Sequence, residues 1–148
     1  MIMTNLQDIE KKINSELTTK ISSSEIRHEQ LYITIDSKDI TDVILFLKIN
    51  ESTKFKQLID ITAVDYPEDD QRFRLVYLLL SHENNVRIII QSSINENEII
   101  PSITNIYPSA NWMEREVFDM YGISFKDHPD LRRILTDYGF EGHPLRKD

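Results

Sequence analysis

Apolar residues recur at helical spacing in two stretches of the first fifty positions. The first stretch predicts a helix over about 5–18, because four apolar residues share one face: Leu6, Ile9, Ile13 and Leu17. Thr4 and Gln7 have the spacing of a capping box at its start. The second stretch predicts a helix capped by Asp36 or Ser37, with one apolar face: Ile40, Val43, Ile44 and Leu47.

Between and after these helices the pattern changes to that of strands. Apolar and polar residues alternate over 31–35, which predicts a half-buried strand, and 57–65 is rich in β-forming residues. The clearest pair is Phe73–Ser81 and Val86–Gln91, separated by the polar residues 82–85. This arrangement predicts an antiparallel hairpin. Both strands are almost continuously apolar in their middles, so we expect the hairpin to be central and covered by helices.

Two further helices are predicted before position 122. A third apolar series, with Pro101 in its first turn and Pro108 after its end, indicates a helix through these residues: Ile99, Ile100, Ile103 and Ile106. Asn111 and Glu114 have the spacing of a capping box, and the helix they begin should end at Gly122.

The last segment, 123–148, follows neither period but keeps large apolar residues. Ordering about 25 residues costs roughly 25–40 kcal/mol of backbone entropy, more than burial of six large side chains returns. We therefore expect a single α+β domain over 1–122 and an extended, partner-binding arm over 123–148. The domain should be a two-layer structure, a mixed β-sheet with helices packed on one face.

The composition of the chain argues against several classes of function. The net charge of −8 argues against a nucleic-acid binder and against direct electrostatic attachment to a membrane. The chain has no cysteine, so it provides no thiolates for an iron–sulfur cluster and no disulfide. The longest nearly apolar run, Leu75 to Leu80, is far short of a membrane span, and no signal peptide is visible. We expect a soluble, intracellular protein.

The C-terminal third resembles a known family. Residues 114–125 read Glu-Arg-Glu-Val-Phe-Asp-Met-Tyr-Gly-Ile-Ser-Phe, and His128 and the basic residue Arg132 follow at the family's spacing. Residues 138–148 extend the match in the same register. The segment is similar to the signature of the 30-kDa subunit family of proton-translocating NADH:quinone oxidoreductase (respiratory complex I). Relatives usually continue past the Arg-Lys-Asp sequence at which this chain stops.

The resemblance implies a non-catalytic scaffold subunit in the peripheral arm of the complex, which docks the large quinone-site subunit. It implies no cofactor in this chain, with FMN, iron–sulfur clusters and quinone held by partner subunits. It also implies a peripheral position on the cytoplasmic side of a bacterial inner membrane, or the matrix side in a mitochondrion, with membrane contact only through the complex.

The candidate site is accordingly a partner interface of charged and histidine residues: Glu114, Arg115, Glu116, Asp119, His128, Asp130, Arg132, Arg133, His143, Arg146 and Lys147. Arg115 suits a bidentate carboxylate contact. Chemical alternatives exist for some of these residues. Glu116 and Asp119 share a helix face and could form a catalytic carboxylate pair. His128, Asp130 and His143 could gather a metal, although their spacing matches no compact site.

Three other functions stay open at this point. A homologous subunit of a membrane-bound hydrogenase or a photosynthetic complex would share the signature. A free-standing small enzyme would use the acidic helix and the histidines, and would lose turnover on Glu116→Gln while still folding. The third alternative is an adaptor domain that binds an unrelated partner, without catalytic turnover and without assembly into this complex.

Overall fold

The computed structural model describes residues 6–129. Along the chain the elements are α1 (Leu6–Glu16), β1 (Ile21–Arg27), β2 (Gln30–Ile35), the 3₁₀ turn η1 (Ser37–Asp39), α2 (Ile40–Ile49), β3 (Gln57–Asp65), β4 (Phe73–Ser81), β5 (Val86–Ile94), β6 (Ile99–Pro101), α3 (Ala110–Tyr121) and β7 (Ser124–Lys126). The predicted helices at the N-terminus and after position 36 are confirmed. The expected cap at Thr4 lies outside the described residues.

Five strands form the main sheet in the order β1-β2-β5-β4-β3. The pairing of β2 with β5 is parallel and the other pairings are antiparallel, so the expected mixed sheet is confirmed. The β4–β5 hairpin is central, because β2 and β3 flank it. Its turn contains Asn85 at φ 53°, in the left-handed region that Asn tolerates.

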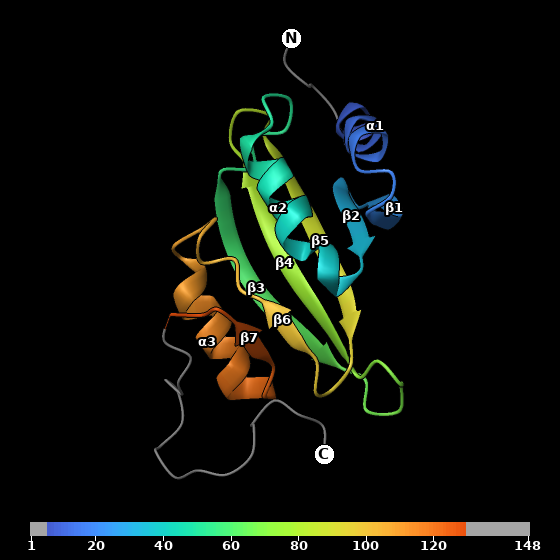
Figure 1. Ribbon diagram of the computed structural model, residues 1–148. Helices are drawn as coiled ribbons and strands as arrows, with labels where there is room; N and C mark the ends of the chain where they lie inside the picture. The colour runs from blue at the N-terminus through green and yellow to red at the C-terminus, as the bar shows by residue number, and fades with distance from the viewer. Residues whose placement is uncertain (1–5, 130–148) are drawn as a thin grey trace.

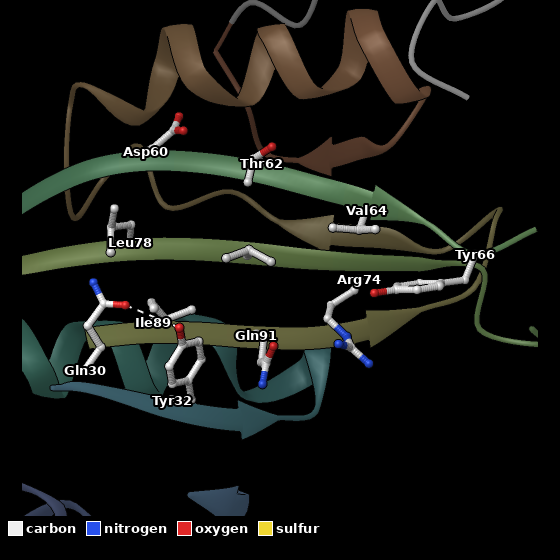
Figure 2. Close-up of a pocket in the computed structure, with 11 residues that line it drawn as sticks. Gln30, Tyr32, Asp60, Thr62, Val64, Tyr66, Arg74, Leu78, Ile89 and Gln91 are labelled. Atoms are coloured by element: carbon white, nitrogen blue, oxygen red, sulfur yellow. Dashed lines mark hydrogen bonds between the residues drawn. The ribbon is translucent and has the colours of Figure 1, made fainter. Parts of the chain in front are cut away.

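One face of this sheet holds the core. Alternate residues of β4 point into it and are fully buried, among them Phe73, Leu75, Tyr77 and Leu79. Helix α2 lies across this face, and β6 crosses the same side below it (Figure 1). The opposite face of the sheet carries no helix among the described residues, as Figure 2 shows from that side. Helices thus cover the hairpin on one face only.

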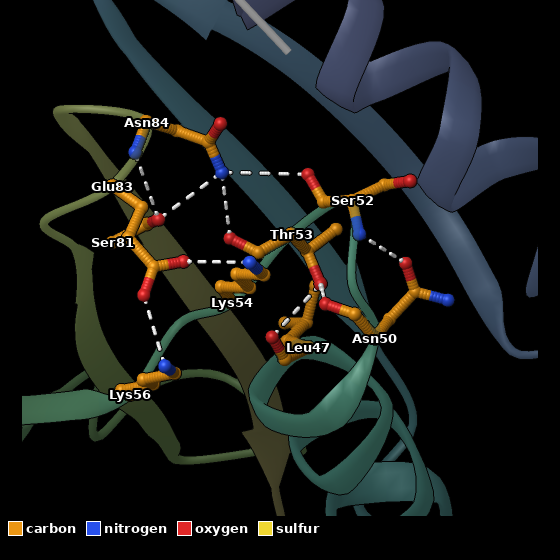
Figure 3. Close-up of polar contacts among 9 residues, drawn as sticks. All are labelled: Leu47, Asn50, Ser52, Thr53, Lys54, Lys56, Ser81, Glu83 and Asn84. Atoms are coloured by element: carbon orange, nitrogen blue, oxygen red, sulfur yellow. Dashed lines mark hydrogen bonds and ion pairs between the residues drawn. The ribbon is translucent and has the colours of Figure 1, made fainter. Parts of the chain in front are cut away.

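A polar cluster joins the end of α2 to the β4–β5 turn (Figure 3). Asn84 Nδ2 donates to Thr53 O at 2.9 Å and to Ser81 Oγ at 3.2 Å. Thr53 Oγ1 donates to Leu47 O at 2.9 Å, which satisfies a carbonyl near the end of the helix. Glu83 pairs with Lys56 at 2.9 Å, an exposed contact that adds little stability.

Strand β1 was not predicted. It contains three serines in a row, and only two of its seven residues are even partly buried. His28 and Glu29 form its turn to β2 with φ of 51° and 64°, the two positive values that a tight hairpin turn needs. Neither the strand nor the turn has the usual residue types, so the sequence gives no signal for this hairpin.

The predicted helix over 99–106 is wrong. Ile99–Pro101 form β6, which pairs in parallel with β7, and turns follow to Pro108. Pro101 has no backbone N–H to donate, and Ser102 N donates to Lys126 O at 3.0 Å instead of within a helix. Of the apolar residues that suggested a helix, Ile99 is 62% exposed, and the others are buried from a strand and the turns that follow it: Ile100, Ile103 and Ile106.

The ends of α3 test two predictions. The helix begins at Ala110 after Ser109, and the side chains expected to form a capping box do not cap it. Glu114 instead hydrogen-bonds outside the helix, to the segment after β6. The C-terminal prediction is confirmed, since Gly122 follows the helix at φ 78° and its N–H donates to Phe118 O.

The chain after Gly122 remains part of the domain for several residues. Ile123 and Phe125 are 1% and 4% exposed, and β7 pairs with β6. The packed structure therefore extends past the boundary that we expected at position 122. The rest of the predicted arm, from Asp130 on, lies outside the described residues.

Candidate partner interface

Glu114 is the first residue of the signature segment, and its side chain is fully buried. Its carboxylate accepts hydrogen bonds from Ile103 N at 2.8 Å and from Ser102 Oγ at 2.6 Å. Burial raises the pKa of Glu114 to about 7, and these two hydrogen bonds only partly oppose the shift because they favour the charged form. The residue therefore ties α3 to the turn after β6.

His128 lies against the same carboxylate. Its Nε2 is 2.9 Å from Asn111 O and 3.9 Å from Glu114 Oε1, and its side chain is inaccessible to solvent. The hydroxyl of Tyr77 is also near, and burial first, then the charge of Glu114, raise the pKa of Tyr77. Glu114 and His128 together fasten the chain after β7 to the start of α3.

The outward side of α3 is different. Trp112 is 54% exposed, and the Arg115 guanidinium lies 5.4 Å from its ring centre. Arg115 Nε is buried and has no hydrogen-bond partner among the described residues. Glu116 is exposed. Trp112 and Glu116 are thus open to solvent on this side, and Arg115 is partly buried beneath them.

Asp119 does not share the exposure of Glu116, because it is fully buried. The carboxylate pair considered from the sequence is thus divided between solvent and the interior, with no common pocket. Among residues 6–129 no group of three His, Asp or Glu residues could hold a metal ion. Asp130 and His143, the other residues weighed as metal ligands, lie outside the described residues.

The expected interface residues therefore fall into three groups. The structure brings Glu114 and His128 together in the interior and also buries Asp119. It leaves Arg115 and Glu116 on the outer side of α3. The remaining residues lie outside the described part of the chain, so their roles stay predictions: Asp130, Arg132, Arg133, His143, Arg146 and Lys147.

The structure also contains a buried ion pair, near the end of α3, that the sequence did not predict. Arg72 Nε and Nη2 donate to the two carboxylate oxygens of Asp65 at 2.7 and 2.9 Å, a bidentate pair. Arg72 is 8% and Asp65 2% exposed. The charge of Asp65 also helps raise the pKa of Tyr121, after the larger effect of burial. The pair lies seven residues apart across a loop, a spacing that no sequence pattern marks.

The open face of the sheet contains a shallow hollow of about 370 Å³ (Figure 2). Its floor is apolar, with Val76, Leu78 and Ile89 from the two central strands. Asp60 and Thr62 border both this hollow and a smaller one between β3 and α3, which Glu116 and Met120 also line. Neither hollow reaches Glu114 or His128.

Comparison with known proteins identifies the class and the family. Residues 33–148 match the family described as respiratory-chain NADH dehydrogenase, 30 Kd subunit. The corresponding NADH-quinone oxidoreductase subunit of Ruegeria sp. strain TM1040 is 50% identical over 97% of this chain and 71% of that protein. That of Dinoroseobacter shibae is 52% identical over 97% of this chain and 66% of that protein.

A solved structure shows the same fold. A chain of the membrane-bound sulfane sulfur reductase, an archaeal respiratory membrane complex, superposes with a TM-score of 0.79. It is 27% identical in sequence, over 95% of this chain and 83% of that one.

The fold and the signature helix define a subunit of a respiratory redox complex. The chain belongs to the 30-kDa subunit family of the respiratory-chain NADH dehydrogenase. This confirms the resemblance read from residues 114–148. None of the helices within 6–129 is long and apolar enough to cross a bilayer.

Proposed function

We propose that this chain is a non-catalytic scaffold of a proton-translocating NADH:quinone oxidoreductase, which docks the large quinone-site subunit. The observation that carries the proposal is the position of the signature residues. Glu114 and His128 fasten the chain after β7 to the start of α3, and neither of them lines the two hollows described above.

The redox groups belong to the partners in this proposal. The chain has no cysteine, so it supplies no thiolate to an iron–sulfur cluster. In this proposal FMN, iron–sulfur clusters and quinone are held by neighbouring subunits. The subunit would be peripheral, on the cytoplasmic side of a bacterial inner membrane or the matrix side of a mitochondrial one, and would reach the membrane only through the complex.

A related complex is the second candidate. The sulfane sulfur reductase chain shares the fold, so a subunit of another membrane-bound redox complex would look the same. Identity near 50% with the two NADH-quinone oxidoreductase subunits, against 27% with that chain, favours the NADH-linked complex.

Co-expression with the large quinone-site subunit from the same genome tests the scaffold role. The full chain should co-elute with that subunit in size-exclusion chromatography, and a chain ending at Pro129 should not. This end point retains β7 and His128, so loss of binding is not caused by loss of the packed strand. Elution of the full chain alone, with the other peripheral-arm subunits also present, would contradict the proposal.

A further inference from the structure

Asp119 is buried on the side of α3 that is turned away from the core. It follows Ala110 by nine residues, about two and a half turns of an α-helix, so the two residues lie on opposite sides of α3. Ala110 is fully buried in the core, and Asp119 is also 0% exposed. Trp112, about two turns before Asp119 on the same side, is 54% exposed. The outer side of α3 is therefore open at its start and covered near its end.

The burial of a carboxylate at this position calls for a cation. Removal of a carboxylate from water is costly unless a cation or hydrogen-bond donors compensate it. A guanidinium suits this role, because it can donate two parallel hydrogen bonds. Two arginines near α3 have other contacts: Arg72 binds Asp65 through two hydrogen bonds, and Arg115 lies over the Trp112 ring. We therefore look for the cation of Asp119 in the segment that covers it.

The place where the described chain ends indicates which segment that is. His128 contacts Asn111 O at the start of α3, and the described residues end directly after it. Asn111 and Asp119 are eight residues apart on the helix, about 12 Å along its axis. Four residues of extended chain span about 13 Å. Arg132 and Arg133 are therefore within reach of Asp119.

We propose that residues 130–133 run along the outer side of α3 and that their arginine pair, Arg132-Arg133, neutralises Asp119. One of the two guanidinium groups forms a buried ion pair with the Asp119 carboxylate. Residues 130–133 then belong to the packed domain, and the partner-binding part of the C-terminal segment begins after them. The inference gives these arginines a role within the chain itself, and it does not depend on the scaffold role.

Arginine-specific labelling of the unaltered full chain tests the pairing without any substitution. The isolated, folded chain is treated with phenylglyoxal, and mass spectrometry measures the modified fraction of each arginine. We expect Arg132 or Arg133 to react at least about tenfold more slowly than Arg87, which is exposed. Reaction of both arginines at the rate of Arg87 overturns the proposal.

A double-mutant cycle identifies the partner of the protected arginine. Arg132→Gln or Arg133→Gln leaves a buried carboxylate without its cation, and should raise the equilibrium constant for unfolding about a hundredfold or more. In an Asp119→Asn chain the same substitution should have an effect at least about tenfold smaller. Glu116→Gln, at the exposed carboxylate one turn earlier, is the matched control and should leave the arginine effect unchanged. Urea unfolding of the full chain measures each constant, and circular dichroism confirms that each variant is folded.

The outcomes distinguish the alternative occupants of the outer side of α3. Non-additivity of Asp119→Asn with either arginine of the pair supports the proposal. Additivity with both, or non-additivity with Arg146→Gln instead, overturns it. Protection from phenylglyoxal that is lost on dilution indicates a second copy of the chain, and also overturns it. No partner subunit enters these measurements, so failure here leaves the scaffold role to its own co-elution test.

Discussion

At the scale of single residues, a charged residue of the signature, Glu114, has a structural role inside the domain. Charged residues follow Glu114 in the sequence, yet its carboxylate is buried. It connects α3 to residues 102–103 and lies against His128. Sequence alone identified Glu114 and His128 as important but placed them at an interface. A helix of mixed charges does not reveal which carboxylate turns inward, because that depends on where residues 102 and 103 lie.

The raised pKa of Glu114 predicts a pH dependence of stability. Between pH 4.5 and about 7 the unfolded chain has released this proton while the folded chain retains it. The free energy of unfolding should therefore fall by about 3 kcal/mol from this group as the pH rises through that window, and level off above it. Glu114→Gln keeps the shape and a hydrogen-bond acceptor but cannot ionise. Urea unfolding from pH 5 to 8 measures both proteins.

The difference between the two pH profiles removes the contributions of titrating groups that lie far from Glu114. We expect the variant to lose the falling slope and to be the more stable protein at pH 8. Identical slopes in the two proteins would contradict the buried, proton-binding carboxylate.

The Asp65–Arg72 pair gives a second prediction at this scale. Arg72→Met leaves the Asp65 carboxylate buried without its guanidinium partner, and should cost about 3–5 kcal/mol of unfolding free energy. Lys12→Met removes one partner of an exposed pair and should cost less than about 1 kcal/mol. Chemical denaturation compares the two. Equal effects would show that the buried pair makes no special contribution.

At the scale of elements, the apolar pattern of the sequence predicted the helices and strands that bury one regular face. The helices α1 and α2 and the β4–β5 hairpin have regular apolar patterns, so their types were predictable. The helix predicted over 99–106 was wrong because its buried isoleucines belong to a short parallel strand and to the turns after it. Strand β1 was missed because its residues lack the apolar alternation of a strand, although it pairs with β2 along its length.

Gly122 ends α3 at a positive φ, which makes its replacement informative. Gly122→Ala should destabilise the domain by about 1–2 kcal/mol, because a Cβ is disfavoured in that conformation. Gly122→Asn should cost less, since Asn tolerates the left-handed region. Thermal unfolding measures the order of the three proteins. An alanine variant as stable as the glycine protein would contradict the observed helix end.

Strand β7 decides where the folded domain ends. Phe125 is 4% exposed, so Phe125→Ala should cost about 3–5 kcal/mol. Lys126→Ala changes the exposed neighbour and should cost less than about 0.5 kcal/mol. If both substitutions were neutral in urea unfolding, the chain after Gly122 would belong to the arm and not to the domain.

At the scale of the whole molecule, the proposed scaffold role concerns the end of the described structure near Pro129, beside the buried Glu114–His128 contact. The main sheet also has an open face. The α+β class, the mixed sheet and the family followed from the sequence. The open face did not, because an apolar strand reads the same whether one or both of its faces are covered.

The central claim is that this chain organises a redox complex without reacting itself. Purification of the tagged full chain from gently solubilised membranes, with NADH-dependent quinone reduction measured on the purified material and on the isolated chain, tests it most directly. We predict that the tag recovers the large quinone-site subunit together with activity, and that the isolated chain has none. Turnover by the isolated chain that Glu116→Gln abolishes, or recovery of the chain without any other subunit, would contradict the account.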